Sequence, residues 1–307
     1  MNHHPLRFHL VLLVAMAIWG SSFVAMKLVV TELSPMVAVF LRMCIGLAAF
    51  TLMARWVLKG FEYRAGDWKY LGAMALMEPC LYFIFESWAL QYTSASQAGM
   101  ITALLPLMVA VSAWWLFTEK VLMRQWLGFA VALVGVIWMT VGGASTEQAP
   151  NPLLGNFLEL LAMVAATAYT LLIKHLTSRY SALFLTAMQS LIGCVFFLPL
   201  ALLSPWPAAI SMEVWATLLY LGVIVTLGGY GLYNYSLSHV KTTVAAGYVN
   251  LIPAFGVLFA VLLLGDQLTI GQWAGVALIF AGVYLSREHK PVPEPTADVD
   301  PPPITPG

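Results

Sequence analysis

The chain has 307 residues, of which 61% are apolar and only 9% charged, and its formal net charge is zero. A soluble domain of this length needs more charge to cover its surface, and a neutral chain offers no basic face for nucleic acid. The composition therefore excludes an ordinary soluble protein and a nucleic-acid-binding protein, and it predicts a protein surrounded by lipid.

The apolar residues come in runs of about twenty, the length at which a helix crosses a hydrocarbon core of about 30 Å. Because lipid offers no partner to free backbone groups, each run is predicted to be a helix. In chain order we expect ten spans, at residues 8–30, 36–58, 68–90, 95–117, 124–141, 153–174, 181–203, 213–236, 243–264 and 270–286. The polar, proline-rich stretch 288–307 is predicted to be a disordered cytoplasmic tail.

The positions of basic residues predict the orientation. Of the 14 Lys and Arg residues, Lys27 and Arg42 lie within predicted spans. The other 12 fall in the N-terminal segment, the tail, the connections on one side of the membrane and the span ends next to those connections. Basic residues concentrate on the cytoplasmic side. We therefore expect a multi-pass protein of the plasma (inner) membrane with both termini in the cytoplasm.

An internal repeat appears when the chain is aligned with itself at an offset of 147 residues. Spans four and five then fall on spans nine and ten without a gap, and Pro106, Gln125, Trp126 and Gly128 meet identical residues. The predicted domains are a first repeat at 1–147 and a second at 148–287. Since each repeat has five spans, the second enters the membrane from the opposite side. Inverted repeats around a central cavity are typical of secondary transporters.

Two features of this repeat leave alternatives open. Pro106 and Pro253 fall about half-way through their spans, where proline removes a backbone hydrogen bond. Each is either a hinge for gating or a static kink. Small residues in spans five and ten predict close helix packing, and this favours packing within a monomer, with a weak homodimer as the other option.

Charged side chains within the spans are the first candidates for a substrate site. Insertion of a charged side chain at the centre of a membrane-spanning helix costs about 2.5–3.5 kcal/mol, so its presence there indicates a structural or functional role. Arg42, Glu86 and Glu159 lie at similar depth, and Glu78 lies nearer the midplane. Glu78, Tyr82 and Glu86 share one helical face, which suits an amine-bearing solute. The alternative is that Arg42 and Glu86 form a structural ion pair.

Other polar residues in the spans give weaker signals. Trp19, Tyr169, Tyr248 and Asn250 are further candidates for substrate binding, although each alone is more typical of contacts between packed helices. Glu78 is a candidate for proton coupling, because a carboxyl near the midplane can exchange a proton.

Dispersed motifs of this sequence resemble the EamA family of the drug/metabolite transporter superfamily. They are Trp19-Gly20-Ser21-Ser22-Phe23 with Lys27, Pro35 and Arg42; 89–96 (ALQYTSAS) with Pro106, Glu119 and Gln125-Trp126-Leu127-Gly128; and Pro253, Gly265-Asp266 and Gln272-Trp273-Ala274-Gly275. The resemblance extends to about residue 287. It implies a ten-helix secondary carrier, often an exporter of amino acids or other metabolites.

From these patterns we expect a secondary transporter that exports a small organic metabolite by alternating access, with proton coupling as an option. A facilitative channel or uniporter and a membrane receptor or scaffold remain as alternatives. A phosphate-binding glycine loop is absent from the sequence, and the histidines lie in the N-terminal segment with the start of the first span, in the inner connections and in the tail. We therefore expect no enzyme, no cofactor, no metal and no catalytic residue.

Overall fold

The computed structural model describes residues 6–59, 62–117, 123–141, 145–147, 149–177, 179–237 and 248–286. The predicted tail 288–307 and the first residues of the predicted ninth span, 243–247, lie outside the described residues.

The regular structure of the described residues is helical, apart from one isolated bridge between Thr146 and Ala149. The elements are α1 (Leu6–Glu32), α2 (Pro35–Leu52), α3 (Ala54–Val57), α4 (Trp68–Ala75), η1 (Leu76–Leu81), α5 (Tyr82–Tyr92), α6 (Ala95–Ile101), η2 (Thr102–Leu104), α7 (Leu105–Phe117), α8 (Met123–Val141), α9 (Pro152–Leu176), α10 (Ala182–Leu202), α11 (Met212–Leu219), η3 (Tyr220–Gly229), α12 (Tyr230–Leu237), α14 (Ile252–Leu264) and α15 (Ile270–Ser286).

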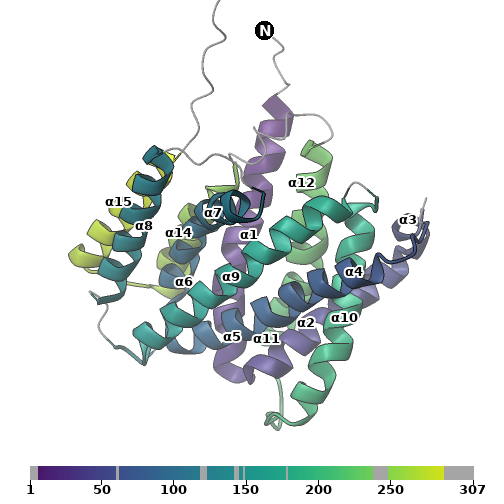
Figure 1. Cartoon of the computed structure of the whole chain (residues 1–307). Helices are drawn as coiled ribbons and strands as arrows, with labels where there is room; N and C mark the ends of the chain where they lie inside the picture. The colour runs from purple at the N-terminus through teal and green to yellow at the C-terminus, as the bar shows by residue number, and fades with distance from the viewer. Residues whose placement is uncertain are drawn as a thin grey trace, which may run out of the picture.

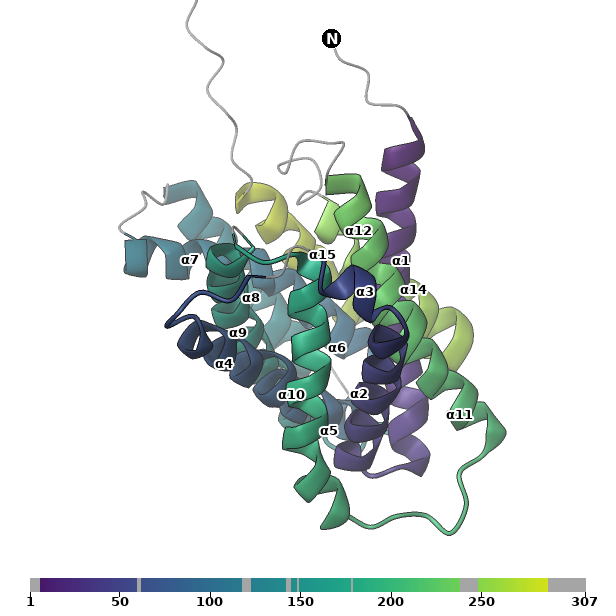
Figure 2. The same cartoon turned by 90° about the vertical axis from the view of Figure 1, so that its right-hand side faces the viewer.

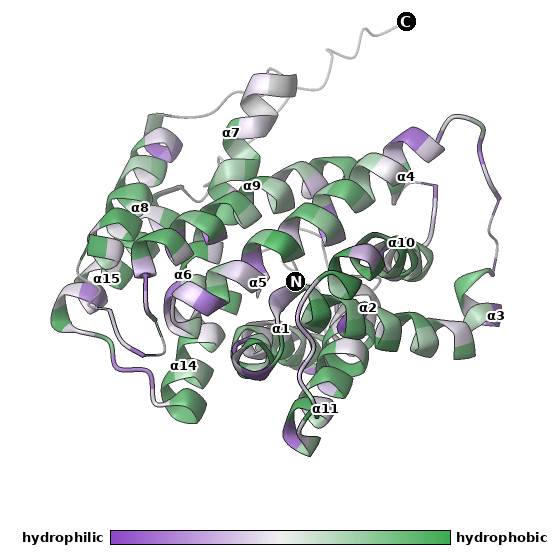
Figure 3. Ribbon diagram, turned by 90° about the horizontal axis from the view of Figure 1, so that it is seen from below, coloured by the Kyte–Doolittle hydropathy of each residue, from purple (hydrophilic) through white to green (hydrophobic). Residues whose placement is uncertain are grey.

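Eight helical stretches are long and apolar enough to cross a membrane, beginning with Arg7–Glu32 and ending with Met212–Tyr233. Two shorter apolar helices, Ile252–Leu264 and Ile270–Leu285, lie where the ninth and tenth spans were expected. Hydrophobic residues cover most of the helices, while hydrophilic residues gather at turns and helix ends (Figure 3). The prediction of an all-helical membrane protein is therefore confirmed, with eight candidate spans among the described residues.

Polar caps set the start of several helices. The side-chain oxygens of Ser94, Ser181 and Ser211 accept hydrogen bonds from backbone N–H groups three residues later, over 3.2–3.3 Å. Asn151 does the same for α9 at 3.2 Å. Each cap satisfies a donor that the first helical turn leaves free, at a typical value of about 1 kcal/mol.

Antiparallel pairs of helices connect the two halves of the chain. Helices α8 and α15 lie side by side (Figure 1), and α2 packs against α10 (Figure 2). At the α8–α15 crossing, a Cβ added to Gly135 would lie 2.7 Å from the Gly275 carbonyl oxygen, and one added to Gly275 would lie 2.8 Å from the Gly135 oxygen. The absence of side chains here lets the two backbones touch.

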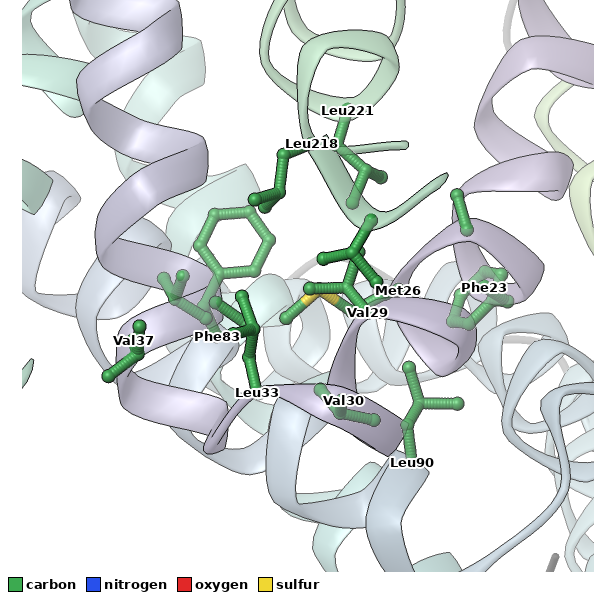
Figure 4. Close-up of a cluster of buried hydrophobic side chains, with 14 of the residues drawn as sticks. Phe23, Met26, Val29, Val30, Leu33, Val37, Phe83, Leu90, Leu218 and Leu221 are labelled. Carbon is green, nitrogen blue, oxygen red and sulfur yellow. The ribbon is translucent and has the colours of Figure 1, made fainter. Parts of the chain in front are cut away.

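The largest buried cluster joins the N-terminal helix to both halves. Phe23, Met26 and Val29 of α1 meet Phe83 of α5 and side chains of α2, α11 and η3 (Figure 4). Dispersion contacts of this kind hold helices together in lipid, where there is little hydrophobic driving force between them. The cluster fixes α5 beside α1 and α2, and thereby positions the polar residues of α5.

The glycine contact at the α8–α15 crossing generates a testable prediction. Gly135→Ala places a methyl group against backbone atoms of Gly275 and Ile279, so the helices must separate. We expect a loss of about 1–3 kcal/mol of stability, the usual cost of overpacking, measured as a lower thermal midpoint in detergent. Gly72→Ala is the matched control, because nothing lies within 4 Å of its added Cβ. Equal midpoints for the two variants would contradict the close crossing.

Candidate substrate-binding site

A break in the third span forms the centre of the site. Glu78 has extended backbone angles (φ −142°, ψ 116°) between two helical stretches. The next residue is Pro79, and proline disfavours helical angles in the residue before it. The Glu78 carbonyl oxygen, which the break frees, accepts a hydrogen bond of 3.0 Å from the Gln189 side-chain amide of α10. An irregular backbone at membrane depth is therefore held by a neighbouring helix.

The eighth candidate span is irregular at the corresponding place. The π-type segment η1 covers 76–81, and the π-type segment η3 covers 220–229. The offset of 147 residues places 76–81 on 223–228, inside η3. The helix is interrupted in η1, at Glu78, and η3 is an irregular but continuous helical segment.

Arg42 of α2 lies beside the break. Its side chain is buried, and its guanidinium carbon lies 4.4 Å from the centre of the Phe83 ring. The stacking satisfies the face of the guanidinium but not its N–H groups, and the Nε atom has no hydrogen-bond partner.

Two glutamates face this region from adjacent helices. Glu86 of α5 accepts a hydrogen bond of 2.8 Å from the Tyr82 hydroxyl, and it lies within electrostatic reach of Arg42. Glu159 of α9 is fully buried and lies within electrostatic reach of Glu86. Tyr82 is in turn within reach of Glu78, Glu86 and Glu159. The structure thus brings together five candidates, which are Arg42, Glu78, Tyr82, Glu86 and Glu159.

The opposite charges of Arg42 and Glu86 are not in direct contact. Among the residues that the structure describes, Arg179 and Asp67 form an ion pair, whereas Arg42 and Glu86 do not approach within ion-pair distance. Several buried atoms of the cluster also lack hydrogen-bond partners, namely Arg42 Nε, Glu86 Oε2, both Glu159 oxygens and Gln189 Oε1. Buried polar atoms are nearly always satisfied in proteins. Several orphaned atoms in one place therefore indicate a site for a polar ligand.

The remaining candidates lie elsewhere. Trp19 packs against Gly229 and contacts Tyr233, with ring centres 5.3 Å apart and ring planes tilted by 45°. The Tyr248 hydroxyl lies 3.0 Å from His9 Nδ1, and Asn250 follows two residues later, in the turn before α14.

Tyr169 belongs to an apolar cluster of α2, α4, α9 and α10 that also contains Phe50 and Met74. It therefore packs with apolar side chains, as do the Trp19 and Tyr248 rings.

The two prolines stand at helix starts. Pro106 is the second residue of α7 and follows the short 3₁₀ turn η2, which divides the fourth span. Pro253 lies in the first turn of α14, where its missing N–H costs nothing. The irregular turn before Pro106 lies inside the candidate span Ala95–Ser112. Gating at these residues remains a prediction.

A cavity of about 600 Å³ lies away from the charged cluster. It opens between α1, α11, η3 and α14, and its lining is almost entirely apolar, with Glu213 at its edge. Its chemistry suits lipid chains or another apolar group rather than a charged solute.

A second polar group, which sequence reasoning did not identify, joins the ends of several helices. Lys27 of α1 donates hydrogen bonds to the carbonyl oxygens of Leu90 and Thr93 at the C-terminal end of α5, the second over 2.9 Å. Asp266 accepts from the Ser96 N–H and hydroxyl at the start of α6, over 3.1 and 2.7 Å. A cation at a helix C-terminus and an anion at an N-terminus are the favourable placements.

The same group extends to α8 and α9 through Asn156. Its side chain accepts from the Thr93 hydroxyl at 2.7 Å, and donates to Gln97 at 2.7 Å and Thr140 at 2.9 Å. We call Lys27, Thr93, Ser96, Gln97, Thr140, Asn156 and Asp266 the polar clasp. The run of small polar residues 93–97 between two apolar spans was the signal that could have revealed it.

The polar clasp generates a second prediction. Asp266→Ala removes the acceptor of two Ser96 hydrogen bonds and the anion within reach of Lys27. We expect a loss of about 1–3 kcal/mol, the cost of leaving buried polar groups unsatisfied, seen as a lower thermal midpoint in detergent. Glu147→Ala changes an exposed acidic residue and serves as control. An unchanged midpoint for Asp266→Ala would show that the clasp adds no stability.

Comparison with known proteins shows the family of this chain. The model of the EamA-like transporter family matches residues 6–141 and 153–287. An uncharacterized transporter of Archaeoglobus fulgidus is 29% identical, with 92% of this chain and 98% of the relative covered. The uncharacterized transporter YetK of Bacillus subtilis is 26% identical, with 91% and 86% covered. A Salmonella typhimurium protein named as a probable amino-acid metabolite efflux pump is 26% identical, with 89% and 92% covered.

The fold is also found among solved structures. A crystal structure superposes with a TM-score of 0.60 at 18% identity and covers 91% of this chain and 96% of the other. The resemblance that the sequence motifs carry is thus confirmed over nearly the whole length of the helical region. The chain is a multi-pass membrane protein and belongs to the EamA-like transporter family.

Proposed function

We propose that this protein is a secondary transporter that exports a small organic metabolite, an amino acid or an amine, by alternating access. The observation that carries the proposal is the broken third span, which lies among buried charged groups whose hydrogen bonds are unmade. Such groups are costly to bury without partners, and a bound solute would supply them.

The chemistry of the site favours a solute with an ammonium group. Glu86 and Glu159 offer three carboxylate oxygens without hydrogen-bond partners, and Tyr82 adds an aromatic ring. Arg42 can bind a carboxylate, so a zwitterion fits both signs of charge. The name of the Salmonella relative, an amino-acid metabolite efflux pump, points to the same solute class.

An architecture of ten spans in two inverted repeats forms part of the proposal. Its main support is that contacts recur when the two halves are exchanged. The offset of 147 residues maps Gly128 onto Gly275 and Gly135 onto Gly282. The contacts Gly135–Gly275 and Gly128–Gly282 are therefore the same contact with the two halves exchanged. On α2 and α10, Gly46 meets Ser190 and Gly193 meets Met43, which are again exchanged positions.

Alternating access is favoured over a channel or a scaffold by the polar clasp. The clasp joins helices of both halves at one end of the molecule, so this end is closed. A channel needs a continuous path, whereas a carrier needs a closure that forms and breaks. We further propose that the termini are cytoplasmic and that the clasp lies on the external side of the plasma (inner) membrane.

The role of Arg42 can be tested by substitution. Arg42→Ala removes a charge-assisted contact worth about 1.5–3 kcal/mol, and we expect at least about a tenfold loss of transport. The assay is the flux of labelled amino acids and amines in proteoliposomes, with the exposed Arg55→Ala as control. The double variant Arg42→Glu/Glu86→Arg separates the alternatives. Full recovery of transport would mean that both residues act structurally and do not bind the solute.

The orientation can be tested by cysteine labelling. In a chain whose three native cysteines are replaced by serine, Ser145→Cys and Glu62→Cys place thiols in exposed connections. We expect an impermeant thiol reagent added to intact cells to label the first variant and to reach the second only after permeabilisation. The reverse pattern would invert the proposed topology, while flux measurements would be unaffected.

A further inference from the structure

Two buried carboxyl groups lie within electrostatic reach of each other on adjacent helices, and most of their oxygens lack hydrogen-bond partners. Glu86 lies on α5 and Glu159 on α9, and these helices pack against each other. Glu86 is 3% exposed and Glu159 is 0% exposed. Of their four oxygens, one accepts a hydrogen bond from Tyr82, and the other three have none.

The charged neighbours of this pair come from few elements. Arg42 of α2 acts on Glu86, and Tyr82 of α5 lies within reach of both carboxyls and of Glu78 in η1. Helices α6 and α7, which also pack on α9, carry no ionisable residue. Helix α1 packs on α5 and carries Lys27, which donates to the carbonyl oxygens of Leu90 and Thr93. The other ionisable residues of α4, α8 and α9 are Lys69, Tyr70, Arg124, Tyr169, Lys174 and His175.

One guanidinium cannot stabilise two carboxylates in this setting. Moving an ionised carboxylate into a medium of low dielectric costs several kcal/mol unless a cation or several donors compensate. The charge of Arg42 can offset one carboxylate, and the second would repel the first as well as lack donors. Two such groups behave as one titrating unit. The pair therefore keeps one proton while the site is closed and dry.

We propose that Glu86 and Glu159 hold one exchangeable proton between them, and that this proton is the coupling ion of the transport cycle. The coupling role of this proton rests on the proposed transport function, whereas the presence of the proton site does not. When the ammonium group of a solute binds, its positive charge replaces that of the proton, and one proton leaves for each ammonium group bound. The exchange conserves charge within the site and couples export of the solute to proton entry.

This assignment differs from the expectation that Glu78 carries the coupling proton. Glu78 is only half-buried and stands at the helix break, where it can meet solvent or solute. Glu159 is fully enclosed, and both of its oxygens lack partners. A site that must retain a proton between openings needs such enclosure.

Infrared spectroscopy of the purified full-length protein in lipid nanodiscs tests the proton site without a solute. We expect the difference spectrum between mildly alkaline and mildly acidic buffer to contain the C=O band of a protonated carboxyl that shifts in D₂O. Glu159→Gln should abolish this band, because the remaining Glu86 carboxylate is then offset by Arg42. Glu78→Gln and the exposed Glu213→Gln should keep it.

The outcomes separate the alternatives. A band that survives both Glu159→Gln and Glu86→Gln, or a wild-type spectrum without a pH-dependent band, would overturn the proposal. If Glu159→Gln does not fold, Glu159→Asp replaces it, because this variant keeps a carboxyl group at a changed position. We then expect the band to shift, and an unshifted band would contradict the proposal. A band that behaves as expected in a protein with no amine or amino-acid flux would retain the proton site and reject the proposed transport function.

Discussion

A backbone carbonyl that leaves its helical hydrogen bond inside a lipid bilayer finds no water to replace the lost donor. The candidate substrate site of this protein depends on how the carbonyl of Glu78 finds another donor. The third span leaves its helical path there, and the exposed carbonyl oxygen is satisfied by the amide of Gln189 from another helix. The break is stable only because α10 supplies this donor. It takes Glu78 out of the helical pattern, while Tyr82 and Glu86 stay one turn apart on α5, which packs against α2 and α9.

The helix pairs around the break hold it in place through backbone contact rather than through large side chains. Glycines bring α8 against α15, and Gly46 and Gly193 bring α2 against α10. In lipid such close approach is the main source of helix association, since apolar side chains gain little by leaving lipid tails. A frame built this way can hold several unsatisfied charges in its interior, because the contacts that stabilise it lie elsewhere.

The two polar groups of the molecule have opposite character. In the polar clasp, Lys27 and Asp266 are matched to helix ends and to hydrogen-bonding side chains, as a structural junction requires. Around the break, Arg42, Glu86 and Glu159 lie near one another but leave hydrogen bonds unmade. Satisfied groups stabilise one conformation, whereas unsatisfied groups gain free energy when a ligand arrives. This contrast supports the proposal that the second group binds the solute.

The sequence by itself determined that the chain is helical and embedded in a membrane, because the length and composition of apolar runs follow directly from the thickness and chemistry of lipid. It also determined the family, through motifs around Lys27, Pro106 and Asp266. It could not show that Lys27 has hydrogen-bond partners while Arg42 leaves its Nε atom unpaired, because both are basic residues in apolar runs. Nor could it show that Trp19 contacts Tyr233 and that Tyr169 packs in an apolar cluster. Whether a buried polar atom finds a partner depends on distances between helices far apart in the chain, so only the tertiary structure decided which charges are satisfied and which wait for a ligand.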